Sequence, residues 1–182
     1  MRHVAILSRV FIAPIVALLL LPVSPWAGDT EHDRATLKGV EALWAVVGGL
    51  GPEAEQDGRT AAQFQRDVEV HPRQAGIALD STSHHVLHVN VTAVRREIGV
   101  YAYAIEVAFL QPVRLLRDPR LVHNFAVTWI VGEVGMVGAT VLSTVQSTVM
   151  DLVDQFINAY FDQNPRKVTR ISPVVIPLRG QA

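Results

Sequence analysis

The chain has 182 residues and a nearly balanced charge, with 16 Lys and Arg side chains against 17 Asp and Glu. It contains no cysteine, which excludes disulfide bonds, thiolate chemistry and a lipid-modified N-terminal cysteine. The segment 28–164 holds 10 basic and 17 acidic side chains, a net charge of −7. This body is a poor binder of nucleic acid, because phosphates are neutralised by a basic surface.

The first 27 residues have the pattern of a secretory signal peptide. The chain opens with three basic side chains, Arg2, His3 and Arg9. The apolar run 10–21 follows, and residues 22–27 then supply helix breakers and small residues. We expect cleavage after Ala27 and a periplasmic protein. A retained N-terminal membrane anchor is the alternative, because the uncharged run 10–28 approaches the ~20 residues that span a bilayer.

Two segments follow the predicted cleavage site. The polar segment 28–39 is expected to be a flexible lead-in. The segment 40–47 (VEALWAVV) is rich in branched and aromatic residues and predicts a buried strand, which the glycines of 48–51 end. The first part of the α+β domain that we expect over 40–164 is therefore a strand.

A helix is predicted to begin after Thr60. Its hydroxyl can cap free amides, and Gln63 completes a capping-box pattern. Pro72 removes a backbone donor, so we expect the regular helix to end near Val70 and to continue only as a bent last turn. Gly76 is the natural left-handed stop.

Two alternating segments predict an antiparallel hairpin. In 84–95 and 100–110, large apolar residues recur at every second position, and a short polar turn joins the two segments. The second strand has large side chains on one face. Its other face has small side chains and a single carboxylate. That second face consists of Ala102, Ala104, Glu106 and Ala108.

An Arg-rich connection over 114–124 is expected to lead to a third strand, 125–131, which Gly132, Gly135 and Gly138 end. The strongest helix of the chain is predicted over 141–163, because apolar residues recur at spacings of three and four. The apolar stripe includes Leu142, Val145, Val149, Leu152, Val153, Phe156 and Tyr160. Asn164 and Pro165 end this helix, and 165–182 is expected to be a basic, Pro-containing tail.

The order strand, helix, three strands, helix predicts an α+β fold. The simplest packing is a two-layer sandwich, a mainly antiparallel sheet with both helices on one face. The helices then cover the large-residue face of the sheet. The face that contains Ala102, Ala104, Glu106 and Ala108 is left free for a partner or a second copy, and an ordinary solvated sheet face is an equal alternative.

No catalytic, cofactor-binding or metal-binding residue is predicted. His84, His85 and His88 do not converge on one point of a strand, so we expect exposed strand-end histidines rather than a zinc site. The segment GEVGMVG, 132–138, matches neither of the phosphate-binding patterns G-x-G-x-x-G and G-x-x-x-x-G-K-[ST]. Its glycines are therefore expected in turns or bulges. The oxygens of Asp151, Asp154 and Asn158 are too few for calcium and indicate a solvated helix face.

Two alternatives to a docking surface stay open. The first is a small periplasmic hydrolase that uses Glu106 or a histidine, with His88 or His123 as the candidate second group. The second is membrane contact through the N-terminus or the basic tail. The basic residues of that tail nearest the domain are Arg166, Lys167 and Arg170, and for these a solvated chain end is the preferred interpretation.

The order of elements over 40–164 resembles the small periplasmic domain at the N-terminus of TolB, and auxiliary lipoproteins of envelope transporters. The likeness lies in the strand 40–47, the helix that ends Ala75-Gly76-Ile77, the meander 85–131 and the helix that ends Phe156-Ile157-Asn158-Ala159-Tyr160. Residues 1–182 contain neither a lipobox cysteine nor a β-propeller. The resemblance carries over no functional residue, and it implies a non-catalytic envelope accessory that acts by protein–protein contact.

Overall fold

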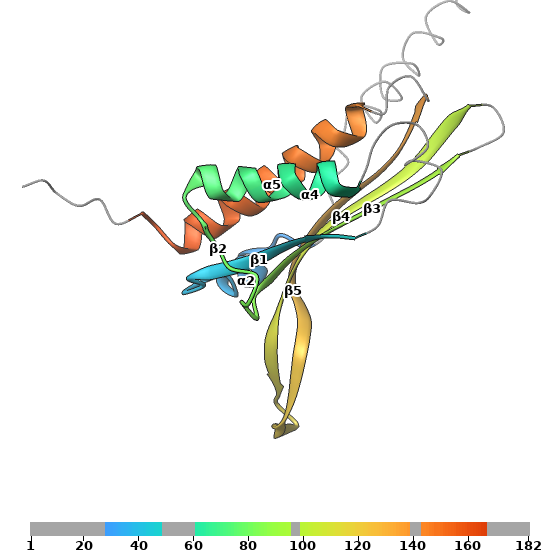
Figure 1. Ribbon diagram of the computed structural model, residues 1–182. Coiled ribbons are helices and arrows are strands. Elements are labelled where there is room, and N and C mark those ends of the chain that lie inside the picture. The colour runs from blue at the N-terminus through green and yellow to red at the C-terminus, as the bar shows by residue number, and fades with distance from the viewer. Residues whose placement is uncertain (1–27, 49–60, 96–98, 139–142, 167–182) are drawn as a thin grey trace, which may run out of the picture.

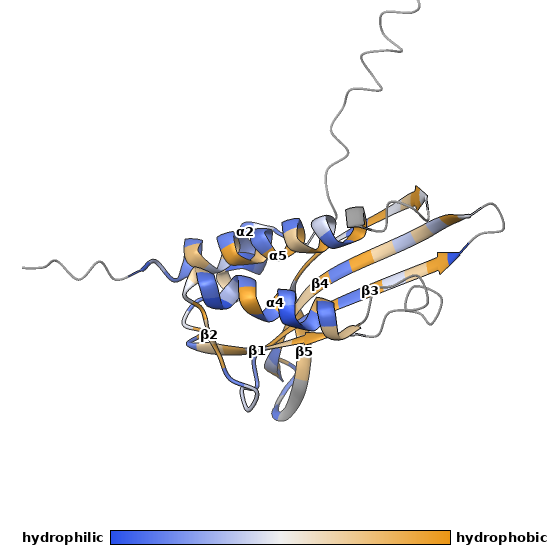
Figure 2. Cartoon of the chain, turned by 45° about the horizontal axis from the view of Figure 1, so that its top comes forward, coloured by the Kyte–Doolittle hydropathy of each residue, from blue (hydrophilic) through white to orange (hydrophobic). Residues whose placement is uncertain are grey.

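The structure, a computed structural model, describes residues 28–48, 61–95, 99–138 and 143–166 (Figure 1). Its elements are α2 (Glu31–Ala35), β1 (Ala42–Val47), α4 (Ala61–Ala75), β2 (Ala78–Leu79), β3 (Val86–Arg95), β4 (Val100–Leu115), β5 (Asp118–Gly138) and α5 (Ser143–Gln163). Within these ranges the strands form one five-stranded sheet, and both long helices lie on the same side of it (Figures 1 and 2). The predicted α+β class is confirmed. The predicted signal peptide 1–27 and most of the tail, 167–182, lie outside the described residues.

The sheet is mixed, with strand order β2-β1-β3-β4-β5. β1 pairs in parallel with both β2 and β3, because α4 carries the chain back across the sheet before β2 and β3 begin. The remaining pairs, β3 with β4 and β4 with β5, are antiparallel, as the predicted meander requires. β2 is a two-residue strand that the sequence analysis did not predict.

The hairpin of β4 and β5 is longer than predicted. The predicted connection 114–124 is instead strand, and the chain turns at 116–117. The pairing register shifts between Phe109 and Leu110, between Gln111 and Val113 and between Arg114 and Leu115. Such irregularities increase the local twist, and the end of the hairpin projects away from the sheet (Figure 1). Arg114, Leu116, Arg117 and Arg120 are exposed, as is expected at the end of a strand pair that leaves the sheet.

The glycines that were expected to end the third strand lie inside β5. Gly135 is directly opposite Tyr103, and a Cβ atom at Gly135 would lie 2.5 Å from the Tyr103 hydroxyl oxygen. A Cβ atom at Gly132 would lie 2.7 Å from the carbonyl oxygen of Ile105. These glycines therefore allow a close approach across the strand pair, which is a known use of glycine within strands.

Helix α4 continues through Pro72 to Ala75, so the predicted end near Val70 was wrong. Gly76 has a φ of 94° and donates to the carbonyl of Arg73, while the Ile77 amide donates to the carbonyl of Pro72 at 2.9 Å. These two bonds form a Schellman motif, and the side chain of Ile77 is buried behind it. The motif and the burial of Pro72 hold the last helical turn in place despite the missing proline donor.

Helix α5 carries the centre of the hydrophobic core. The predicted apolar stripe is buried at Val145, Val149, Leu152, Val153, Phe156 and Tyr160. The ring of Phe156 lies 5.3 Å from that of Trp129, 5.7 Å from Phe109 and 6.3 Å from Tyr160, measured between centroids. The helix ends at Gln163, as predicted, while the predicted stripe residue Leu142 lies outside the described residues.

The predicted flexible lead-in 28–39 instead contains a short helix and core residues. Thr30 and Asp33 form a capping box at the start of α2. Leu37 is buried in the main core. The carbonyl of Gly28 accepts a hydrogen bond from the amide of Ile130 on β5. This segment packs as an integral part of the domain because the buried side chain of Leu37 follows its polar helix and Gly28 bonds to β5.

A charged cluster joins this segment to β5 and α5. Both carboxylate oxygens of Asp29 accept hydrogen bonds from Arg34, and Asp29 Oδ1 also accepts from Trp129 Nε1 at 2.7 Å. Arg34 reaches across to Asp162 on α5. Burial of Asp29 opposes its ionisation, but the hydrogen bonds from Arg34 and Trp129 and the charge of Arg34 outweigh it, so the pKa of Asp29 is lowered from 3.8.

We expect Asp29→Asn to lower the free energy of unfolding by about 1.5–3 kcal/mol at pH 7, the usual range for hydrogen bonds to charged groups. The folded state lowers the pKa of Asp29, so its contribution is complete well above pH 3.8 and is lost as pH falls through the lowered pKa. Urea unfolding at pH 7 and near pH 3 should therefore show a difference that shrinks in acid.

Asp162→Asn is the matched control, because this carboxylate bonds the same Arg34 while its side chain is 56% exposed. It should cost less than about 1 kcal/mol. Equal losses for the two variants, or a loss for Asp29→Asn that does not depend on pH, would contradict the central role of Asp29.

Candidate functional site

The side of the sheet that faces away from α4 and α5 is the candidate site. We call it the open face, and it consists of Trp44, Val46, His88, Asn90, Thr92, Val94, Ala102, Ala104, Glu106, Ala108, Leu110, Val127, Ile130, Gly132, Val134 and Met136. These residues alternate in the strands with the buried core residues, and the strand register brings them side by side. The two helices cover only the opposite side (Figure 2).

The open face exposes large apolar side chains. Trp44 is 42% exposed, Val94 51%, Val127 50%, Val134 60% and Met136 67%. Single exposed apolar residues are ordinary, but exposed apolar residues that recur on β1, β3 and β5 at one side of the sheet, with the alanines of β4 between the last two strands, form a patch. Such patches mark interaction sites on folded proteins.

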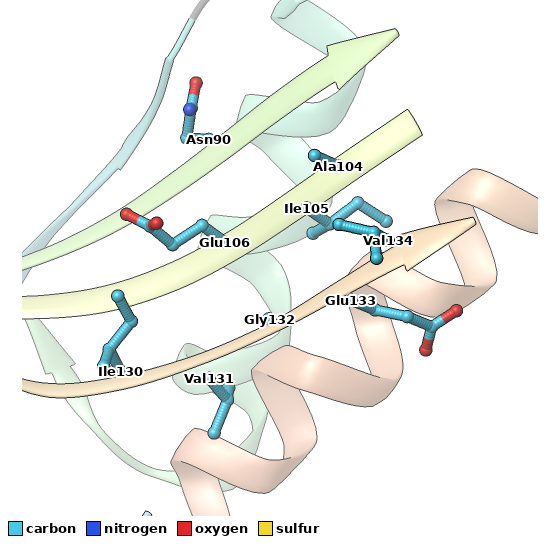
Figure 3. Close-up of a pocket in the computed structure, with 9 residues that line it drawn as sticks. All are labelled: Asn90, Ala104, Ile105, Glu106, Ile130, Val131, Gly132, Glu133 and Val134. Atoms are coloured by element: carbon cyan, nitrogen blue, oxygen red, sulfur yellow. The ribbon is translucent and has the colours of Figure 1, made fainter. Parts of the chain in front are cut away.

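A shallow hollow of about 90 Å³ lies within the open face around Glu106. Glu106 is opposite Asn90 on β3 and opposite Gly132 on β5. Gly132 has no side chain, so a space is left between Glu106, Ile130 and Val134 (Figure 3). The wall of the hollow is mainly apolar, and among the described residues Glu106 makes no hydrogen bond or ion pair that would neutralise it.

The four residues of the predicted interaction face lie in one line along β4, but they are not equally accessible. Ala104 is exposed, while Ala102 and Glu106 are half-buried. Ala108 is only 1% exposed, because it lies between His88 and Ile130 on the neighbouring strands. The small side chains thus form a floor between larger residues of β3 and β5.

The hollow does not bring Glu106 together with a second catalytic group in the described part of the chain. The other carboxylate at its wall, Glu133, points to the opposite side of the sheet (Figure 3). There it accepts a hydrogen bond of 2.8 Å from the Tyr103 hydroxyl. His88 is opposite Ala108 and does not line the hollow, and the side chain of His123 lies outside the described residues.

The pair of Tyr103 and Glu133 was not anticipated from the sequence. Burial raises the pKa of Tyr103, and the hydrogen bond to Glu133 and its negative charge raise it further, while a hydrogen bond with Thr148 opposes this. The pair ties β4 to β5 at the position where Gly135 makes room for the tyrosine ring. The sequence signal for this pair is Gly135, which was interpreted from its residue type as part of a strand end.

The predicted histidines are separated in space. His84 is exposed, the ring of His85 stacks on Phe109 with centroids 6.1 Å apart, and His88 lies on the open face beside Gly48. No group of three His, Asp or Glu side chains within the described ranges is arranged to hold a metal ion. Asp151, Asp154 and Asn158 are exposed on α5, as the sequence indicates for a solvated helix face.

A second hollow, of about 220 Å³, lies between α4 and the β1–β2 edge. Its charged side chains already have partners. Glu69 pairs with Arg73, and Asp80 accepts hydrogen bonds from the backbone and the hydroxyl of Thr82, which lower the pKa of Asp80. These contacts stabilise the local loop and helix, so the hollow at Glu106 is the stronger candidate.

Of the basic tail residues, Arg166 is described. It donates to the carbonyl of Ala75 at the end of α4, and its guanidinium lies 4.5 Å from the centre of the Phe161 ring. These contacts place Arg166 at the joint end of α4 and α5. Lys167 and Arg170 lie outside the described residues. Within the part of the chain that is described, neither long helix nor α2 has the length and apolar character that a membrane span requires.

No protein-family model matches this chain, and no curated protein is significantly similar to it.

Proposed function

We propose that this protein is an exported, non-catalytic interaction module of the cell envelope, and that the open face is its binding surface. The observation that carries the proposal is an apolar side of the sheet that no described element covers, while the opposite side packs against the helices. Desolvating Trp44, Val134 and Met136 against a partner would add about 25 cal/mol for each Å² of apolar surface removed from water. The face is therefore suited to bind protein.

The sequence of the N-terminal segment supports export, and the fold is compatible with its cleavage. The first 27 residues have the order of a secretory signal, with a basic start, an apolar centre and a region of small residues. Gly28 and Asp29, which follow the predicted cleavage site, already make contacts with β5. Cleavage after Ala27 would leave these contacts intact. The resemblance in element order to envelope accessory domains supports the same class of function.

Site-specific crosslinking tests whether the open face binds a partner, because the chain has no cysteine and an introduced one is its only thiol. Met136→Cys places a single thiol on the open face, and Asp151→Cys places one on the exposed side of α5. Each is labelled with a thiol-directed photo-crosslinker and irradiated with envelope extract. We expect the open-face variant to capture a defined partner that the α5 variant does not capture.

The captured protein must then bind the unlabelled chain saturably. Val134→Glu places a charge in the apolar patch without touching the core, and it should weaken this binding at least tenfold. Capture from α5 alone, or binding that Val134→Glu does not change, would refute the assignment of the open face as the binding surface.

A further inference from the structure

We propose that the partner places a lysine or arginine side chain, flanked by apolar residues, in the hollow at Glu106. This inference rests on the proposed function and specifies the chemistry of the partner. The occupant is a protein segment that lies across the open face. Its apolar residues contact β5, and its cation pairs with Glu106.

The charge pattern of the open face points to a cation. Glu106 carries the only carboxylate among the residues of that face, and the face contains no lysine or arginine. Its neighbours at the hollow are the amide of Asn90 and the apolar walls of Ile130 and Val134. Glu106 has no hydrogen-bond or ion-pair partner within the described residues, so the pairing capacity of this carboxylate is unused.

The energetics of burial lead to the same partner. A partner that covers Val134 and Met136 also removes water from Glu106, because the hollow lies between β3 and β5. A buried carboxylate without a partner is strongly unfavourable, whereas one paired with a cation in a hydrogen-bonded geometry offsets much of that cost. A partner without a cation at this position would therefore bind the open face less tightly, because it would bury the charge of Glu106 unpaired.

The size of the hollow fits the end of a long basic side chain. Its volume of about 90 Å³ is several times the ~10–15 Å³ that a single water needs. The amide oxygen of Asn90 provides an additional acceptor for an ammonium or a guanidinium. The aliphatic stem of a lysine or arginine would then lie along Ile130 and Val134.

A second copy of this chain is a poor occupant. A two-fold dimer buries the same patch on both subunits, so an arrangement centred on β4 would bring the two Glu106 carboxylates toward each other. Like charges that face each other in a sheet contact are destabilising. The face supplies no basic side chain of its own to relieve this repulsion.

The test uses the purified protein and two synthetic peptides. The first is acetyl-Val-Thr-Val-Thr-Arg-Thr-Val-Thr-amide, which places the arginine and three valines on one face of an extended strand; the second has citrulline, which is neutral and of nearly the same shape, in place of arginine. Calorimetric titration at low salt should show at least tenfold tighter binding of the arginine peptide. Glu106→Gln should abolish this preference, while Glu133→Gln should retain it.

Glu133→Gln is the matched control because it removes the same charge from a neighbouring residue whose carboxylate points to the other side of the sheet. Thermal unfolding of both variants shows that the fold is retained. Equal affinities for the two peptides, no binding of either, or a preference that survives in Glu106→Gln would overturn the cationic partner.

Two further outcomes would identify a different occupant and overturn the inference. Butylguanidinium that binds as tightly as the arginine peptide would indicate a small organic cation. A concentration-dependent dimer that dissociates in Met136→Lys would indicate a second copy. In either case crosslinking from Met136→Cys still decides whether the open face binds a partner protein, so the two proposals can fail separately.

Discussion

Phe156→Ala should lower the free energy of unfolding by about 3–5 kcal/mol. Phe156 is fully buried, and its ring contacts the rings of Phe109, Trp129 and Tyr160 from three different elements. Truncation removes the transfer free energy of the ring and leaves a cavity that these large neighbours cannot fill without leaving their own contacts. Aromatic pairs of this kind also contribute energy beyond their buried area.

Urea unfolding followed by tryptophan fluorescence measures this loss, since Trp129 lies against the substituted ring. Phe125→Ala is the matched control, because it makes the same truncation at a side chain on β5 that is 43% exposed. It should cost far less than Phe156→Ala. Similar losses at the two sites would mean that α5 does not carry the centre of the core.

Gly135→Ala should destabilise the protein by about 1–3 kcal/mol, although alanine is usually harmless in an exposed strand. The new Cβ atom would lie 2.5 Å from the Tyr103 hydroxyl oxygen and within 2.8 Å of two ring carbons. The ring cannot move freely, because it is only 8% exposed and its hydroxyl donates to Glu133. The strand pair or the tyrosine must therefore shift.

A double-mutant cycle with Tyr103→Leu separates this clash from the strand propensity of glycine. In the Tyr103→Leu background the ring is absent, and Gly135→Ala should be neutral or slightly stabilising. The coupling free energy between the two substitutions should then be at least about 1 kcal/mol. A Gly135→Ala effect that is the same in both backgrounds would show that the tyrosine ring does not determine the need for glycine.

Periodicity was sufficient to predict the elements that bury one face. The two-residue alternation in β3 and β4 and the spacings of three and four in α5 placed Leu87, Val107 and Phe156 in the core, where the structure has them. Gly76 was predicted as a helix stop from its lack of a Cβ atom, and its positive φ confirms this. These signals are local, so a sequence displays them directly.

The errors occurred where distant residues decide the local structure. Gly135 resembles a strand breaker until Tyr103 is placed opposite it, and the segment 114–124 resembles a loop until β4 and β5 are paired in register. The lead-in was judged from its polar residues, although Leu37 has a place in the core. In each case, contacts with distant residues override the local structural preference of the segment.

Some features of the candidate site could be predicted from the sequence, and others depend on strand pairing. The small-residue face of β4 and the isolated Glu106 were visible in the sequence, because alternation separates the two faces of a strand. The hollow could not be predicted, since it requires Gly132 to lie opposite Glu106 and that register depends on pairing between two strands. Ala108 belongs to the same face, yet its neighbours on both sides cover it.

The sequence by itself determined the α+β class, the exclusion of cysteine chemistry and the residues that form each buried stripe, because composition and period are properties of the chain alone. Only the tertiary structure decided the strand order, the parallel pairing of β1 and the line of Glu106 with Asn90 and Gly132. These features depend on which strands meet and in which register, and contacts between residues far apart in the chain determine both.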